Sequence, residues 1–317
     1  MTDQPQERRA SILVEQNDAH EALLSEFRAQ RAATPDVSVY HYTSDVGVFE
    51  ILKSGLLWLS DFTTLNDPTE LSHGIDVGLD ALRAEVSTRG NDPLEADFVG
   101  GIENVYSRGL HSILRGYVLS LSLEPDELTQ WRSYGGVGAG YCVGFDSLQL
   151  DRALHAFGGA TQNIGYSSFE VLYNDALLVQ TMLPHIRISL NALRRLLAPN
   201  DAQLKKLAVD LLYAMMFKAL YFKHHAYRSE REYRILLLSS GFEPEPAGLQ
   251  KRATRNDVVD YLTLDWKSSF ASALRSIKVG PAANMPKSLV FLQKAKDMYL
   301  PSNFSLTIDQ STIPFRG

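Results

Sequence analysis

The sequence of 317 residues contains a single cysteine, Cys142. One thiol cannot build a disulfide framework or a cysteine-based zinc site within the chain. Because Cys142 stands in the apolar run 141–145, we expect it to be a buried, small hydrophobic side chain. A chain without disulfides is typical of a reducing compartment, so the sequence predicts a cytoplasmic location.

The chain also lacks a hydrophobic run long enough to cross a bilayer. Its most apolar segment, residues 211–222, is interrupted by Lys218 and is shorter than the roughly 20 residues of a membrane helix. Residues 1–10 carry charges and have no apolar core of the kind found in signal peptides. We therefore expect a soluble protein with no membrane partner.

An excess of positive charge is absent as well. Lysine and arginine number 31 against 37 aspartates and glutamates, which gives a net charge of −6. Such a chain has no long-range field that attracts nucleic acid. Nucleic acid is thus not the favoured partner, although a local basic patch is compatible with this charge.

Several familiar catalytic motifs are missing. The glycine cluster 135–140 lacks the Gly-x-Gly-x-x-Gly spacing of a dinucleotide loop and precedes a strand, so it is interpreted as a turn, with a substrate-facing loop as the alternative. His224 and His225 are adjacent, so on a helix their side chains diverge and cannot share an ion. Neither His-Glu-x-x-His nor Gly-x-Ser-x-Gly occurs. We expect no metal site and no nucleophilic hydrolysis.

Strand-like and helix-like segments alternate along the chain. Hydrophobic residues make up 45% of it, enough for a sizeable core. We predict strands at 38–43, 56–60, 117–123, 141–145, 232–238, 258–264, 274–279 and 304–308. We predict helices at 45–53, 70–84, 94–114, 127–133, 176–197, 201–224 and 287–298.

Strands occur both before and after the long helical block. This pattern favours one α+β domain over residues 38–317, with a central mixed or antiparallel sheet assembled from distant strands and a helical insertion at about 174–225. Residues 1–37 are predicted to carry a peripheral helix.

The first predicted unit is a strand, a helix and a strand, and it presents a histidine. His41 and Tyr42 are polar residues where a core strand would continue with Val or Ile, and Gly55 ends the helix. Downstream, Asn66-Asp67-Pro68 predicts a turn and Asp67 a helix cap beside the same pocket. The simpler interpretation of Asp67 is a cap without any binding role.

Two further clusters are candidates for the same site. Trp131 and Tyr134 lie three residues apart on one helical face, so they are either core or an aromatic platform. In a strand, Glu230, Glu232 and Arg234 share one face. This face is either a solvated Glu-Arg edge or a site with a catalytic carboxylate. We expect His41, Glu230 and Glu232 to line one concave pocket.

The motifs His41-Tyr42-Thr43, Asn66-Asp67-Pro68-Thr69-Glu70 and Glu230-x-Glu232-Tyr233-Arg234, in this order, resemble a bacterial family of domains of unknown function, DUF2971. The resemblance covers about residues 38–285. In addition, Tyr40-His41-Tyr42-Thr43 with Ser54-Gly55-Leu56 resembles the first strand and turn of ADP-ribosyltransferase-like domains.

The second resemblance implies an ADP-ribosyltransferase-like fold and a nucleotide-type small molecule, NAD, as co-substrate. It implies an enzyme that transfers ADP-ribose to a protein or nucleic acid, or hydrolyses NAD, in a bacterial defence or toxin system. Its histidine holds the nicotinamide ribose and its late-strand glutamate stabilises an oxocarbenium-like transition state. By position these roles fall to His41 and Glu232, with Glu230 as an orienting group, and the reverse assignment of the two glutamates stays open. The implied binding residues are His41, Tyr42, Thr43, Asn66, Asp67, Ser120, Trp131, Tyr134 and Arg234.

Two other functions are compatible with the same residues. One is a non-catalytic module that senses a ligand or a partner, in which the polar residues are structural. The other is a metal-assisted hydrolase or nuclease that uses His41, Asp67, Glu70 and Glu232. The macromolecular acceptor and the oligomeric state do not follow from the sequence.

Overall fold

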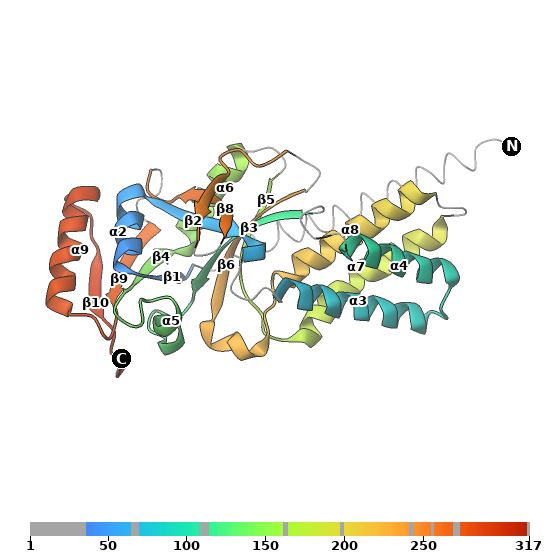
Figure 1. Cartoon of the computed structure of the whole chain (residues 1–317), viewed down its shortest axis with the longest axis horizontal. Coiled ribbons are helices and arrows are strands. Elements are labelled where there is room, and N and C mark those ends of the chain that lie inside the picture. Colours follow the sequence, from blue (N-terminus) through green and yellow to red (C-terminus); the bar gives the residue numbers. More distant parts are fainter. Residues whose placement is uncertain are drawn as a thin grey trace.

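A computed structural model describes residues 36–64, 70–107, 109, 114–160, 164–196, 200–240, 244–254, 257–268 and 273–315. The predicted N-terminal helix and the Asn66-Asp67-Pro68 turn lie outside these residues. Within them the fold is mixed, with one large sheet and helices on its faces and at one end (Figure 1). The α+β expectation is therefore confirmed at this level.

The strands form one sheet in the order β10-β9-β4-β1-β3-β2-β8-β7, and β6 and β5 branch from β3. The pairs are antiparallel except for the parallel pair β9 and β10. The strands are β1 (Ser38–Thr43), β2 (Leu56–Asp61), β3 (Leu114–Ser122), β4 (Tyr141–Asp146), β5 (Ile164–Glu170), β6 (Glu232–Ser240), β7 (Gln250–Ala253), β8 (Val258–Asp265), β9 (Leu274–Val279) and β10 (Thr307–Gln310).

The branch at β3 positions the candidate site. One edge of β3 pairs with β6 along its whole length, from Leu114 to Ser122. The other edge of β3 pairs with two strands in turn. β2 pairs with it at Tyr117 and Val118, and β1 pairs with it only at Ser122, which lies opposite Tyr40. Between these two points β3 has no partner strand on that edge among the described residues, and His41 lies beside the gap.

The helices form two groups, each with its own hydrophobic core. Near the sheet, α2 (Asp45–Ser54), α6 (Ser147–Ala160) and α9 (Met285–Tyr299) cover apolar side chains of the central strands. At one end of the sheet, α3 (Glu70–Thr88), α4 (Pro93–Ser107), α7 (Asp175–Arg195) and α8 (Asp201–Ala219) pack on one another and on the ends of β3 and β6 (Figure 1). Short helices η1 (Phe62–Thr64), α5 (Leu128–Ser133) and η3 (His225–Glu230) complete the described elements.

The predicted insertion corresponds to α7 and α8. These helices do not stand alone, because α3 and α4, which come much earlier in the chain, complete the helical group. The predicted helix 94–114 was too long: α4 ends at Ser107 and β3 begins at Leu114, where pairing with β6 decides the conformation. The elements α6, β5 and β7 had not been predicted.

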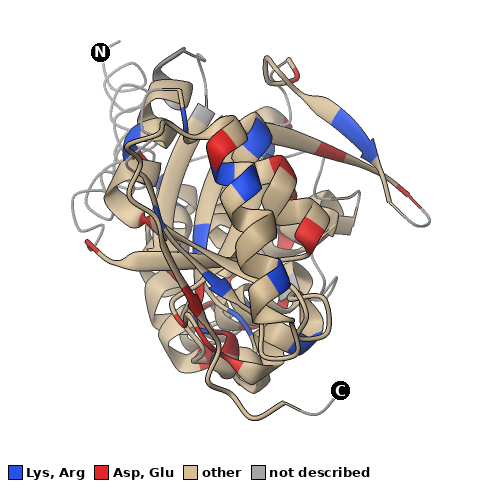
Figure 2. Ribbon diagram, turned by 90° about the vertical axis from the view of Figure 1, so that its left-hand side faces the viewer, with Lys and Arg blue, Asp and Glu red and all other residues tan. Residues whose placement is uncertain are grey.

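Charged residues of both signs are interspersed along the ribbon in the view of Figure 2. This distribution agrees with the small net charge of −6. Within the described part of the chain, no helix is long and apolar enough to cross a membrane.

Candidate functional site

A cavity of about 100 Å³ is lined by residues of β1, β3, β6 and α5 and of the segments next to them. We call it the carboxylate cavity. Its lining includes seven residues that the sequence analysis had singled out: His41, Tyr42, Ser120, Tyr134, Glu230, Glu232 and Arg234. The structure thus brings the first strand and the Glu-x-Glu segment to one place, although most of the chain separates them.

His41 reaches the cavity from β1, beside the gap in the pairing of β3. The preceding unit forms as expected: α2 follows β1, and Gly55 ends it in the left-handed conformation with φ 72°. The N-cap of α2 is Ser44, whose side chain accepts a hydrogen bond from the Gly47 N–H. Burial lowers the pKa of His41 to about 4, in spite of an opposing hydrogen bond with the Ser120 backbone. The imidazole is therefore neutral at pH 7.

Glu232 is the most strongly held acidic group in the cavity. Arg234, two residues along β6 and on the same face, donates from Nε to Oε1 at 2.8 Å and from Nη2 to Oε2 at 3.0 Å. Lys223 Nζ also donates to Oε2, at 3.1 Å. Burial alone would raise the pKa of Glu232, but the charges of Arg234 and Lys223 outweigh it and hold this pKa at about 2. The carboxylate is ionised and rigidly oriented.

Glu230 lies just outside the strand. The predicted strand shared with Glu232 does not extend to this residue: Glu230 is the last residue of η3, and β6 begins at Glu232. Arg231 between them has φ 40°, a left-handed conformation that is uncommon for a residue other than glycine. This turn lets both carboxylates reach Lys223, whose Nζ lies 2.8 Å from Glu230 Oε2.

The two carboxylates differ in the hydrogen-bonding capacity that they leave for a ligand. Both oxygens of Glu232 accept hydrogen bonds from Arg234, and Lys223 adds a further one. Glu230 accepts from Lys223 through Oε2, while its Oε1 accepts no hydrogen bond from the described part of the chain. A ligand in the cavity can therefore engage Glu230 without breaking an existing ion pair.

Two predicted binding residues do not line the cavity. Trp131 is completely buried, donates its indole N–H to Asp126 at 2.7 Å and packs edge-on against Tyr42. It is therefore core, the first of the two interpretations, because the short helix α5 turns it inward. Thr43 is also absent from the lining. Asn66 and Asp67 lie outside the described residues.

The remaining lining residues had not been predicted: Tyr40, Leu121, Ser122, Gln130 and Lys223. Lys223 is the most consequential omission because it joins the two carboxylates. A lysine directly after the apolar helix 211–222, shortly before a Glu-x-Glu motif, is a signal that could have found it. Gln130, the residue before Trp131, is buried, and no sequence motif identifies it as a site residue.

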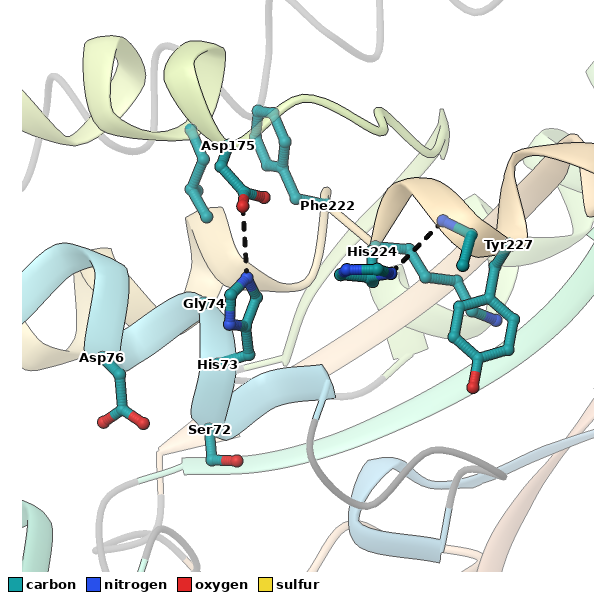
Figure 3. Close-up of a pocket in the computed structure, with 11 residues that line it drawn as sticks. Ser72, His73, Gly74, Asp76, Asp175, Phe222, His224 and Tyr227 are labelled. Atoms are coloured by element: carbon teal, nitrogen blue, oxygen red, sulfur yellow. Dashed lines mark hydrogen bonds and ion pairs between the residues drawn. The ribbon is translucent and has the colours of Figure 1, made fainter.

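A second and larger cavity, of about 570 Å³, lies beside the first and shares Lys223 with it. Its wall comes from the first turns of α3 and α7 and from the connection between α8 and η3 (Figure 3). We call it the histidine cavity, after His73 and His224. None of its polar side chains was among the predicted site residues.

Among the described residues, no three histidine, cysteine or acidic side chains are grouped so that they could hold a metal ion. The predicted alternative ligand set includes Asp67 and the side chain of Glu70, which lie outside that part of the chain.

Comparison with known proteins gives one match. No curated protein and no solved structure is significantly similar to the chain. Residues 130–235, which run from α5 through the Glu-x-Glu segment, match the family described as protein of unknown function, DUF2971. This match supports the family predicted from the motifs, over residues 130–235 of the chain.

Proposed function

We propose that the carboxylate cavity binds the nicotinamide end of NAD and cleaves its N-glycosidic bond, so that ADP-ribose passes to water or to a macromolecular acceptor. The observation that carries the proposal is the convergence of neutral His41 with Glu230 and ionised Glu232 on one cavity. An ADP-ribosyltransferase-like arrangement of the strands is part of the proposal.

The proposed chemistry requires a fixed negative charge. When the bond between the ribose C1′ and the nicotinamide nitrogen breaks, its electron pair leaves with nicotinamide and positive charge builds on the ribose. A preorganised carboxylate in a site shielded from water stabilises that charge. Water, or a hydroxyl or amine of an acceptor, then attacks C1′ and loses a proton.

The contacts change the assignment of the two glutamates that the resemblance implied. Glu232 is charge-compensated by Arg234 and Lys223, so we assign it a positioning role that holds Lys223 in place. Glu230 retains an acceptor oxygen and becomes the group that faces the developing charge. His41, as a neutral imidazole, is suited to hydrogen bonding with the ribose rather than to charge stabilisation.

The test is nicotinamide release from NAD by the purified chain. We expect Glu230→Gln, which keeps the shape and removes the charge, to lower turnover about 10²–10³-fold, the range found when one stabilising group is removed from such a site. Glu245→Gln, at an exposed residue of the chain, serves as the matched control and should leave turnover unchanged. Full activity of Glu230→Gln would contradict the assignment of Glu230.

One observation favours a second candidate function. The two carboxylates and the two cations balance one another, which also suits a structural network in a non-catalytic ligand-sensing module. Absence of nicotinamide release from the wild-type chain, with water and with protein acceptors, would favour this alternative.

A further inference from the structure

The histidine cavity carries an inference that rests in part on the proposed function. The carboxylate cavity, at about 100 Å³, has room only for the reacting end of a nucleotide. The histidine cavity, at about 570 Å³, is in the range of a small-molecule site, roughly 300–1,000 Å³. Lys223 lines both, so a ligand that reaches past Lys223 would occupy the two together.

Two imidazoles line the histidine cavity: His224 can donate from Nε2, and His73, whose Nε2 is directed at Asp175, can donate from Nδ1 when its ring carries both protons. His224 Nδ1 accepts a hydrogen bond from the Ala226 N–H at 3.2 Å, so the proton of the neutral ring is on Nε2. His73 comes from α3 and its Nε2 lies 3.4 Å from Asp175 Oδ2, at the start of α7. The ring centres of His73 and His224 are 6.4 Å apart, and Figure 3 shows the two side chains entering from different elements.

One helix start lies beside these imidazoles. Asp175 is the first residue of α7, a helix of 21 residues. Backbone N–H groups at helix starts favour phosphate oxygens. The carboxylate of Asp175 would repel a phosphate, but its Oδ2 lies beside the His73 imidazole.

The remaining lining suits the rest of a nucleotide. Tyr227 is 37% exposed, and its ring can contact a nucleobase. Leu178 and Phe222 also line the cavity, but they are buried. Asp76, an exposed carboxylate of the lining, can accept from ribose hydroxyls.

We infer that the histidine cavity binds a nucleoside diphosphate, the part of the proposed substrate that does not react, with its phosphates at His73 and His224. The two cavities then form one site in which Lys223 stands between the reacting end and the phosphates. The expected ligand class is an adenosine diphosphate group, free or as part of NAD.

The test measures binding of ADP to the full chain by calorimetry, because ADP has no nicotinamide and its binding is independent of turnover. ADP should bind, and adenosine should bind at least tenfold more weakly. His73→Asn and His224→Asn should each weaken ADP about tenfold, as expected when a hydrogen bond to a charged group is lost. His225→Asn is the matched control, since His225 is the neighbouring histidine and is outside the lining.

The outcomes separate this inference from the proposed function. ADP binding that depends on His73 and His224, without nicotinamide release, would support the inference and contradict the glycosidic chemistry. Nicotinamide release, together with ADP binding that is unaffected by substitution of His73 and His224, would support the glycosidic chemistry and contradict the inference. The inference is overturned if the wild-type chain fails to bind ADP, or if His225→Asn weakens binding as much as His224→Asn.

Discussion

The pKa of Glu232, about 2, reflects a buried ion pair rather than an exposed edge. Glu232→Gln would leave the buried Arg234 guanidinium and Lys223 ammonium without one of their partners.

We therefore expect Glu232→Gln to lower the free energy of unfolding by about 3–5 kcal/mol, the cost of breaking a buried pair. Urea unfolding at pH 7 measures it. The control is Glu50→Gln, which removes an exposed i,i+3 pair with Lys53 and should cost less than about 1 kcal/mol. Equal effects of the two substitutions would contradict the buried network.

A second residue-scale prediction concerns acid stability. The pKa of His41 is about 4 in the folded chain, against 6.5 for a free side chain, so the unfolded state binds more protons between these values. His41 therefore makes stability fall as the pH drops from about 6.5 towards about 4. Glu232 acts in a lower window, from 4.5 down to about 2.

We expect the wild-type chain to lose stability between pH 7 and pH 5, and His41→Gln to lose less over the same interval. Urea midpoints at the two pH values test this. Identical pH dependence of the two proteins would show that His41 is not the group responsible.

At the scale of elements, close packing of α3 on α8 depends on glycine. A Cβ at Gly74 would stand 2.5 Å from the Ala219 Cβ and 3.0 Å from its Cα, and the backbone of α8 has no flexible end that could move away. This contact also fixes the first turn of α3, which carries His73. The helical group and the histidine cavity are thus coupled.

Gly74→Ala should destabilise the chain by about 1–3 kcal/mol through overpacking. Gly100→Ala is the matched control on α4, where a Cβ would meet no atom within 4 Å. It should stabilise by about 0.4–1 kcal/mol, because alanine is the better helix former. Thermal unfolding compares the two, and a stabilising effect of Gly74→Ala would contradict the packing.

At the scale of the whole molecule, Ser311 and Thr312 of the C-terminal segment form hydrogen bonds with the loop after β3. Asp126 accepts hydrogen bonds from Trp131 Nε1 at 2.7 Å, from Ser311 Oγ at 2.6 Å and from the Thr312 N–H at 3.1 Å. This loop leads into α5, which carries Gln130 and is followed by Tyr134; both line the carboxylate cavity. Residues from the middle and from the C-terminal part of the described fold therefore hold one wall of the site.

Asp126→Ala should cost about 1–3 kcal/mol, because it leaves the buried indole N–H of Trp131 without a partner. Ser311→Ala removes one of the three hydrogen bonds and should cost about 1 kcal/mol or less. Urea unfolding ranks the two. A larger cost for Ser311→Ala would show that Asp126 is not the centre of this contact.

The sequence by itself determined the local elements and the residues with unusual chemistry. The β-type composition of residues 38–43 and the glycine at position 55 specify β1, α2 and the turn into β2, because β propensity and left-handed backbone are properties of a few neighbouring residues. The same local reasoning identified His41, Glu230 and Glu232 as candidates for one pocket, and all three line it.

Tertiary structure alone decided which side chains those residues meet. Lys223 reaches the two glutamates because Leu172 and Phe222 bring the end of α8 beside the start of β6, a contact between distant segments. Trp131 turned inward and Tyr134 toward the cavity because Asp126 and the C-terminal segment fix α5. Such choices depend on burial and charge contributed by remote residues, and no pattern along a single segment contains that information.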